Sequence, residues 1–180
     1  IRDSMMGTTA SQVRQDFNCF GGFGQQGYGY NVSNLTGEIK RIMGIDRKHT
    51  IIIVGAGNIG HALTNFPGFA ETGFEVKALF DVNEDLIGTE IKGHPVLDVK
   101  DMDEYIRENQ IDIGVIAARR SAAQEIADRM CAAGIRGIWN FVPLDITTSV
   151  PIENVHLSES LSTLSYKIEL SLIHISEPTR

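Results

Sequence analysis

The feature that most constrains the fold is a short apolar run followed at once by closely spaced glycines. Residues 51–54 read Ile-Ile-Ile-Val, and Gly55, Gly57 and Gly60 follow in a G-x-G-x-x-G pattern. A run of β-branched residues without polar alternation is typical of a parallel strand that is buried on both faces. Glycines between such a strand and a helix form the phosphate-binding turn of dinucleotide-binding domains. The pattern therefore predicts a Rossmann-type nucleotide site at this turn.

The middle of the chain continues with strands and helices in alternation. We expect strands at 75–80, 111–117 and 137–141, and helices from Asn58 to about Phe66, at 101–109 and at 121–133, the last ended by Gly134. This order predicts an α/β fold with a doubly wound parallel sheet. Asp81 ends the second strand, where a carboxylate accepts hydrogen bonds from the adenosine ribose and repels a 2′-phosphate. The motif and this strand end predict these cofactor contacts: Gly55, Ala56, Gly57, Asn58, Ile59, Gly60, Asp81 and Val82.

No catalytic group accompanies this predicted cofactor site. His61 falls inside the first helix, His94 falls before Pro95 in an expected loop, and His156 follows the last predicted strand. None has a carboxylate partner at helical spacing, there is no nucleophile elbow, and too few residues remain to form a substrate domain. We therefore expect that the chain is not an enzyme. A small NAD-dependent oxidoreductase fragment, or a nucleotide-binding module without a DNA role, stays open as the alternative.

The N-terminal part has a different pattern. Thr9 is positioned to cap a helix whose apolar stripe is Val13, Phe17 and Phe20. The opposite face is polar and consists of Ser11, Gln12, Arg14, Gln15 and Asn18. Such a face suits a DNA major groove, where Arg pairs with guanine and Gln with adenine, although a solvent-exposed amphipathic helix is the commoner reading. Residues 21–30, GGFGQQGYGY, predict a tight hairpin, and Ser33 is expected to cap the helix that follows.

Composition excludes several other classes. With 180 residues, 42% of them hydrophobic, and a net charge of −7, the chain is too apolar to be disordered. No apolar run approaches the roughly 20 residues that span a bilayer, so no membrane contact is expected. Cys19 and Cys131 lie far apart without metal-ligand spacing, which favours free thiols in a reduced intracellular protein.

Five segments together resemble one known family. SQVRQDFNCFGGFGQQGYGYNV (11–32), IIIVGAGNIG (51–60), FDVNEDLIG (80–88), GIRGIWNFVPLDI (134–146) and ENVHLSESLSTLSYKI (153–168) closely resemble the Rex family of redox-sensing transcriptional repressors. The resemblance extends from about Met6 to Ile168. It implies a cytoplasmic homodimer with a winged-helix domain, a Rossmann domain and an exchanged C-terminal helix. It also implies that operator DNA is bound when NADH is low relative to NAD+ and is released when NADH binds.

The same resemblance implies roles for individual residues. The helix at 9–20 corresponds to the family's recognition helix, and the hairpin corresponds to the wing. The DNA-binding candidates are therefore Ser11, Gln12, Arg14, Gln15, Asn18, Gln25, Gln26 and Tyr30. Ala117 and Ala118 match a loop that lines the cofactor, and Asn140, Phe141 and Pro143 match an N-F-x-P segment near the nicotinamide. Four residues depart from the pattern of other members: Ala118 and Arg119 stand where many have Val-Pro, and Gln15 and Gln26 stand where some have a basic residue.

These readings divide the chain into four parts. We expect a partial winged-helix domain at 1–48, a Rossmann NAD(H)-binding domain at 49–156, a dimerisation helix at 157–170 and an extraneous tail at 171–180. Leu161, Leu164 and Ile168 form an apolar stripe on that helix, which predicts a homodimer. The family's winged helix normally begins well before the position of Ile1, so the chain is expected to be truncated at its N-terminus.

Overall fold

The computed structural model describes residues 11, 12, 15, 24–25, 29–42, 44 and 47–175. The chain divides into two compact units, Ile1–Lys48 and His49–Arg180, and each is described by itself.

The first unit contains the predicted hairpin and a helix. Strands β1 (Gly24–Gln25) and β2 (Gly29–Tyr30) pair antiparallel, with Gly24 opposite Tyr30, which confirms the hairpin. Helix α3 (Val32–Ile42) follows. The expectation that Ser33 caps this helix is wrong, because Ser33 lies inside the first turn. The cap is Asn31, whose Oδ1 accepts a hydrogen bond from the Asn34 N–H at 3.2 Å.

The second unit is built on a seven-stranded sheet with the order β5-β6-β4-β3-β7-β8-β9. Every neighbouring pair is parallel except β5 and β6. The strands are β3 (His49–Val54), β4 (Phe74–Asp81), β5 (Glu90–Ile91), β6 (His94–Asp98), β7 (Ile113–Ile116), β8 (Gly137–Asn140) and β9 (Ile152–Asn154). The chain runs outward from β3 to β4 and β6 and then crosses to β7. The strand order therefore reverses between β3 and β7, where open α/β sheets bind their ligands.

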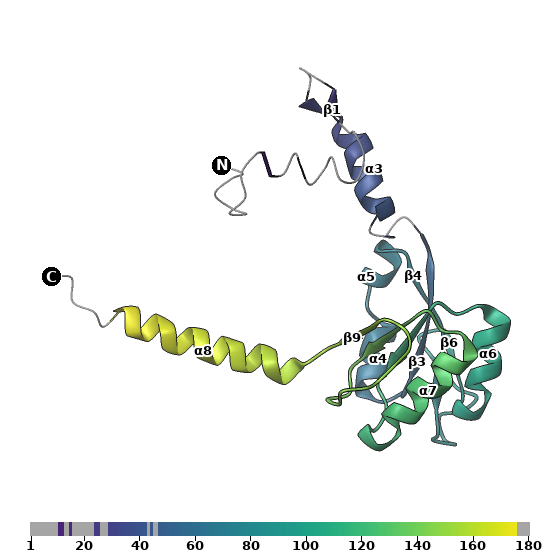
Figure 1. Ribbon diagram of the computed structural model, residues 1–180. Helices are drawn as coiled ribbons and strands as arrows, with labels where there is room; N and C mark the ends of the chain where they lie inside the picture. Colours follow the sequence, from purple (N-terminus) through teal and green to yellow (C-terminus); the bar gives the residue numbers. More distant parts are fainter. Residues whose placement is uncertain are drawn as a thin grey trace. The chain divides into compact units, whose positions relative to one another are not determined.

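Helices cover both faces of this sheet (Figure 1). One face is covered by α6 (Met102–Asn109) and α7 (Ala123–Ala133), which pack over Ile52 and Val54. The other face, on the side of Ile51 and Ile53, is covered by α4 (Asn58–Thr64) and α5 (Gly68–Glu71). All four strand residues are at most 2% exposed. This confirms the prediction that the apolar run is a strand buried on both faces.

The expected alternation of strands and helices holds only in part. No helix lies in residues 82–93, between β4 and β6, or in residues 141–151, between β8 and β9. The first of these segments instead contains β5, which pairs with β6 as a hairpin. His94 lies on β6, so the expectation that it lies in a loop is wrong. Pro95 is tolerated in this strand because parallel pairing with β4 begins only at Val96.

Two single residues end the helices that precede β7 and β8. Gln110 follows α6 with φ 49°, and Gly134 follows α7 with φ 98°. Both lie in the left-handed region, where glycine is favoured. Gly134 therefore ends α7 as predicted. The last element is helix α8 (Leu157–Ile175). Within the described part of the chain, no helix is long and apolar enough to cross a membrane.

Candidate functional site

A cavity of about 800 Å³ lies at the carboxyl ends of β3, β4 and β7, at the point where the strand order reverses. Its size suits a small-molecule ligand. Six of the residues predicted to contact a cofactor line it: Gly55, Gly57, Asp81, Val82, Ala117 and Ala118. Residues from three strands that are distant in sequence therefore meet at one site.

Two of the three motif glycines are required by the fold itself. Gly55 has φ +106°, and a Cβ there would collide with the carbonyl of Ala117 at the end of β7. A Cβ on Gly60 would collide with the carbonyl of Gly55, so the start of α4 packs directly on the turn. These glycines let the turn, the helix and β7 pack without a gap, whether or not a ligand is bound.

Gly57 is different, because none of the residues that the structure describes requires a glycine there. Its φ is −77°, which any residue adopts, and a Cβ would meet no atom within 4 Å. The missing side chain leaves the backbone open toward the cavity. Gly57 also makes no side-chain cap to α4, so the N–H groups of the first helical turn are available to a ligand. Backbone N–H groups and open space are what a pyrophosphate needs, and this part of the site fits that group.

Asp81 connects the site to the turn. Its Oδ2 accepts a hydrogen bond from the Ala56 N–H at 2.7 Å, and its Oδ1 accepts from the Val82 and Asn83 N–H groups at 2.7 and 2.9 Å. An ionised carboxylate offers about four acceptor positions. The second position on Oδ2 is therefore the one open to a ligand hydroxyl. The Val82 side chain is 69% exposed beside it and provides an apolar surface.

The remaining motif residues surround the cavity without lining it. Ala56 and Gly60 are buried, and Asn58 and Ile59 are exposed on the first turn of α4. Sequence reasoning missed other cavity residues, among them Asn83, Leu86, Val99, Ser121 and Ile126. Val99 follows directly after β6, so recognising that strand would have identified it.

The N-F-x-P segment at the end of β8 does not line this cavity. Phe141 is held next to β7 by a hydrogen bond from its N–H to the Ile116 carbonyl at 2.9 Å, and its ring packs against Trp139 with centroids 4.5 Å apart. Pro143 is exposed. The Asn140 side chain is fully buried and faces the protein interior, not a ligand cavity. Its role in this structure is to hold the loop that follows it.

The predicted DNA-facing residues are described only in part. Ser11, Gln12 and Gln15 are helical and exposed, and Gln25 and Tyr30 lie on the two strands of the hairpin. Arg14, Asn18 and Gln26 lie outside the described residues, as do Thr9, Val13, Phe17, Cys19 and Phe20. Cys131, in α7, is a free thiol.

Comparison with known proteins gives consistent matches over most of the chain. Residues 46–144 match the family described as CoA binding domain. A redox-sensing transcriptional repressor Rex of Clostridioides difficile is 52% identical over 90% of this chain and 78% of its own length. A second, from Thermoanaerobacter sp., is 48% identical over 91% of this chain and 74% of its own length.

Solved structures agree with these relatives. The structure of RSP in complex with beta-NAD+ and operator DNA matches with a TM-score of 0.86 and 46% identity, covering 96% of this chain and 80% of that one. RSP in complex with beta-NADH matches with a TM-score of 0.81 and 43% identity over 97% and 83% of the two chains. RSP is itself described as a Rex-family repressor. The fold, the strand-end cavity and these identities lead to one conclusion: the chain belongs to the Rex family of redox-sensing transcriptional repressors.

Proposed function

We propose that this protein represses transcription by binding operator DNA and that NADH, bound in the cavity at the ends of β3, β4 and β7, releases it. The observation that supports this most directly is Gly57, whose missing side chain serves no purpose in the fold and leaves room for a pyrophosphate. Relatives with 43–46% identity were solved with NAD+, NADH and operator DNA. The protein is a regulator and not an enzyme, as are the repressors that it matches.

Each part of the dinucleotide has a partner among the residues of this chain. Gly55, Gly57 and the first turn of α4 would hold the pyrophosphate. The open acceptor on Asp81 Oδ2 would bind a ribose hydroxyl, and its charge would repel a 2′-phosphate, which favours NADH over NADPH. Val82 would contact the adenine.

Preference for the reduced cofactor follows from charge. The nicotinamide ring of NAD+ is positively charged and that of NADH is neutral. Ala117 and Ala118 line the cavity with apolar groups, and the exposed Arg119 beside them adds positive charge. Both features disfavour a cationic ring, the first through lost solvation and the second through repulsion.

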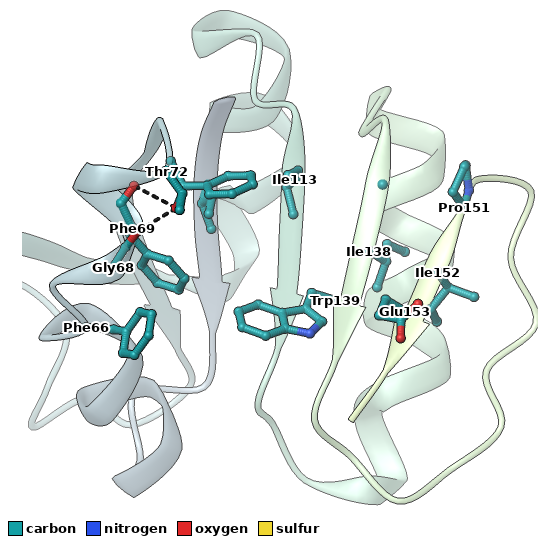
Figure 2. Close-up of a pocket in the computed structure, with 13 residues that line it drawn as sticks. Phe66, Gly68, Phe69, Thr72, Ile113, Ile138, Trp139, Pro151, Ile152 and Glu153 are labelled. Atoms are coloured by element: carbon teal, nitrogen blue, oxygen red, sulfur yellow. Dashed lines mark hydrogen bonds between the residues drawn. The ribbon is translucent and has the colours of Figure 1, made fainter. Parts of the chain in front are cut away.

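The dimer proposed for this protein uses helix α8. The side chains of residues 158–170 are all exposed, including Leu161, Leu164 and Ile168 of the apolar stripe. An apolar groove of about 620 Å³ lies on the sheet face opposite α6 and α7. Figure 2 shows Phe66 and Phe69 on one side of it, Pro151 and the β9 residues Ile152 and Glu153 on the other, and Trp139 between them. We infer that this groove receives α8 of a second copy.

DNA titration with and without cofactor tests the whole proposal. A labelled duplex selected for affinity from a random-sequence pool is titrated with the protein, and anisotropy is measured with NADH, with NAD+ and with neither. NADH should weaken binding about 5-fold or more, a typical allosteric coupling, and NAD+ should not. Arg14→Ala should lose both affinity and sequence preference, because a guanine contact discriminates between bases by about 1–3 kcal/mol. DNA binding that is indifferent to NADH would contradict the sensor function.

A cytoplasmic location belongs to the same proposal, since a repressor of this kind acts on bacterial DNA. Its support is the family's function and not the absence of a membrane helix.

A further inference from the structure

Asn140 is the fully buried polar side chain of the described core, at 0% exposure. Its Oδ1 accepts a hydrogen bond from the Val142 N–H at 2.9 Å. Its Nδ2 lies 3.0 Å from the Val142 carbonyl, 3.1 Å from the Leu144 carbonyl and 2.8 Å from Asn154 Oδ1. Its own carbonyl accepts from the Val155 N–H at 2.8 Å. One residue therefore holds both the loop that follows β8 and the end of β9.

These two segments lead to different parts of the protein. The loop begins at Phe141, whose N–H is bonded to Ile116, and Ile116 is followed directly by the cavity residue Ala117. Asn154 ends β9, three residues before α8 begins at Leu157. Asn154 also lines a polar cavity of about 510 Å³ together with His156, which precedes α8, and with the α8 residues Glu159, Ser160, Thr163 and Lys167. Asn140 thus lies between the ligand-binding edge of the sheet and the base of the exposed helix.

The hydrogen bonds of Asn140 compete with one another. An amide group has two N–H hydrogens, but three acceptors lie within 3.1 Å of Nδ2. The orientation of the amide is fixed, because Oδ1 must face the Val142 N–H. Two of the three acceptors therefore share one hydrogen. Moving a loop carbonyl, that of Val142 or Leu144, away from Nδ2 would leave more of the amide's donor capacity for Asn154. Because the Asn140 amide is buried, water does not replace a hydrogen-bond partner that it loses, so it matters which acceptor is bonded.

We propose that Asn140 couples the occupancy of the dinucleotide site to helix α8, through competition between the loop carbonyls of Val142 and Leu144 and Asn154 Oδ1 for its two amide hydrogens. This rests on the proposed function, because it takes NADH to be the ligand of the cavity. A ligand that shifts the strand end at Ile116 and Ala117 would move the loop through the hydrogen bond from the Phe141 N–H to the Ile116 carbonyl, and would so change how firmly the base of α8 is held. Asn140 is then a positioning residue that touches no ligand, and it links cofactor binding to the helix that joins two subunits.

The test removes the competing acceptor and leaves the ligand site intact. Asn154→Ala deletes Oδ1, whereas Asn154→Asp keeps an oxygen at that position. Trp139 is the single tryptophan of the chain, so energy transfer from it to bound NADH measures affinity. Hydrogen exchange of peptides from 157–168, with and without saturating NADH, measures the response of α8. Thr163→Ala is the matched control, because Thr163 lines the same polar cavity and makes no bond to Asn140.

In the unmodified protein NADH should change exchange in α8 by about 5-fold or more. Asn154→Asp and Thr163→Ala should keep this response. Asn154→Ala should lose the response of α8 to NADH. Its NADH affinity should change by less than about 3-fold, below the lower end of the typical coupling range of about 5-fold. A full response in Asn154→Ala, or an equal loss in Thr163→Ala, would overturn the proposal, as would NADH binding without any change in α8. Absence of NADH binding to the unmodified protein would instead reject the proposed function, and this inference with it.

Discussion

Asp81 Oδ2 accepts a hydrogen bond from the Ala56 N–H at 2.7 Å, which ties the end of β4 to the glycine-rich turn that follows β3. The carboxylate that is open to a ribose hydroxyl is therefore also the group that holds the turn in place. Because one side chain has both tasks, its loss should change the affinity for the dinucleotide as well as the choice between NADH and NADPH.

Replacing Asp81 by Asn keeps the shape but removes the charge and one acceptor oxygen. We expect Asp81→Asn to bind NADH about tenfold more weakly, equivalent to about 1.4 kcal/mol. The affinity of this variant for NADPH should fall less, because the 2′-phosphate of NADPH no longer meets a negative charge. Isothermal titration with both cofactors measures the two constants. Asp98→Asn is the control, because Asp98 is the register partner of Asp81 on β6 and forms an ion pair with Lys100 outside the cavity. This variant should bind both cofactors as the unmodified protein does. Equal binding of NADPH and NADH by the unmodified protein would refute the role of Asp81.

Gly57 and Gly60 should respond in opposite ways to the same added methyl group. Gly57→Ala meets no atom, so its free energy of unfolding should stay within about 0.5 kcal/mol of the original. Its NADH affinity should fall at least about tenfold, because the methyl occupies the ligand's approach. Gly60→Ala collides with the Gly55 carbonyl and should lose about 1–3 kcal/mol of stability. Urea unfolding and NADH titration of both variants separate the effects. Normal NADH binding by Gly57→Ala would show that no ligand approaches there.

Local patterns in the sequence were sufficient to predict the central part of this fold. The apolar run 51–54, the glycines after it and Asp81 each have a local physical reason, and the structure places them at the central strands and at one cavity. The predicted elements after β3 differ from the observed ones mainly in their ends.

What the sequence did not reveal depends on contacts between distant segments. β9 has only three residues and no alternation, and it forms because Ile138 pairs with Ile152. The burial of Asn140 is similar: its partners include Asn154, and no spacing rule predicts that pair. The family resemblance implies that this side chain lies near the nicotinamide, whereas in the structure it is fully buried and bonds to protein groups. For Gly57 the motif predicts the cofactor contact, and the structure adds the open space around it, where a Cβ would meet no atom within 4 Å.

The apolar stripe of α8 gives a prediction about assembly. Leu161 is 68% exposed in the single chain, and burial of such side chains in the groove at Trp139 would hold two copies together. Leu161→Asp should shift the protein toward monomer, raising the dimer dissociation constant at least about tenfold. Ser162→Asp adds the same charge on a neighbouring face of the helix and should leave the dimer intact. Sedimentation velocity over a concentration series measures both. A monomeric unmodified protein at micromolar concentration would contradict the dimer.

Asp112 gives a prediction for acid pH. Its Oδ1 accepts from Arg136 Nη1 at 2.8 Å, and its Oδ2 accepts from the Thr50 N–H at 3.2 Å and lies 3.5 Å from His49 Nδ1. Burial by itself raises the pKa of Asp112, but the hydrogen bonds from Arg136 and Thr50 and the neighbouring positive charge outweigh it and hold the pKa below its ordinary value. A carboxyl whose pKa is lower in the folded state stabilises the fold above its unfolded pKa, near 4.

This stabilising contribution is lost as the pH falls through the lowered pKa of the folded state. We expect the free energy of unfolding to decline below about pH 4, where unfolded Asp begins to bind protons. Asp112→Asn should be less stable at pH 7 by about 1–3 kcal/mol, since it weakens a charged hydrogen bond in a partly buried site. The stability of Asp112→Asn should also decline less steeply in acid, so that the two curves approach each other as the pH falls through the lowered folded-state pKa of Asp112. Urea unfolding across this range measures both effects, with the exposed Glu84→Gln as the control. Parallel acid curves for Asp112→Asn and the unmodified protein would show that Asp112 does not set this pH dependence.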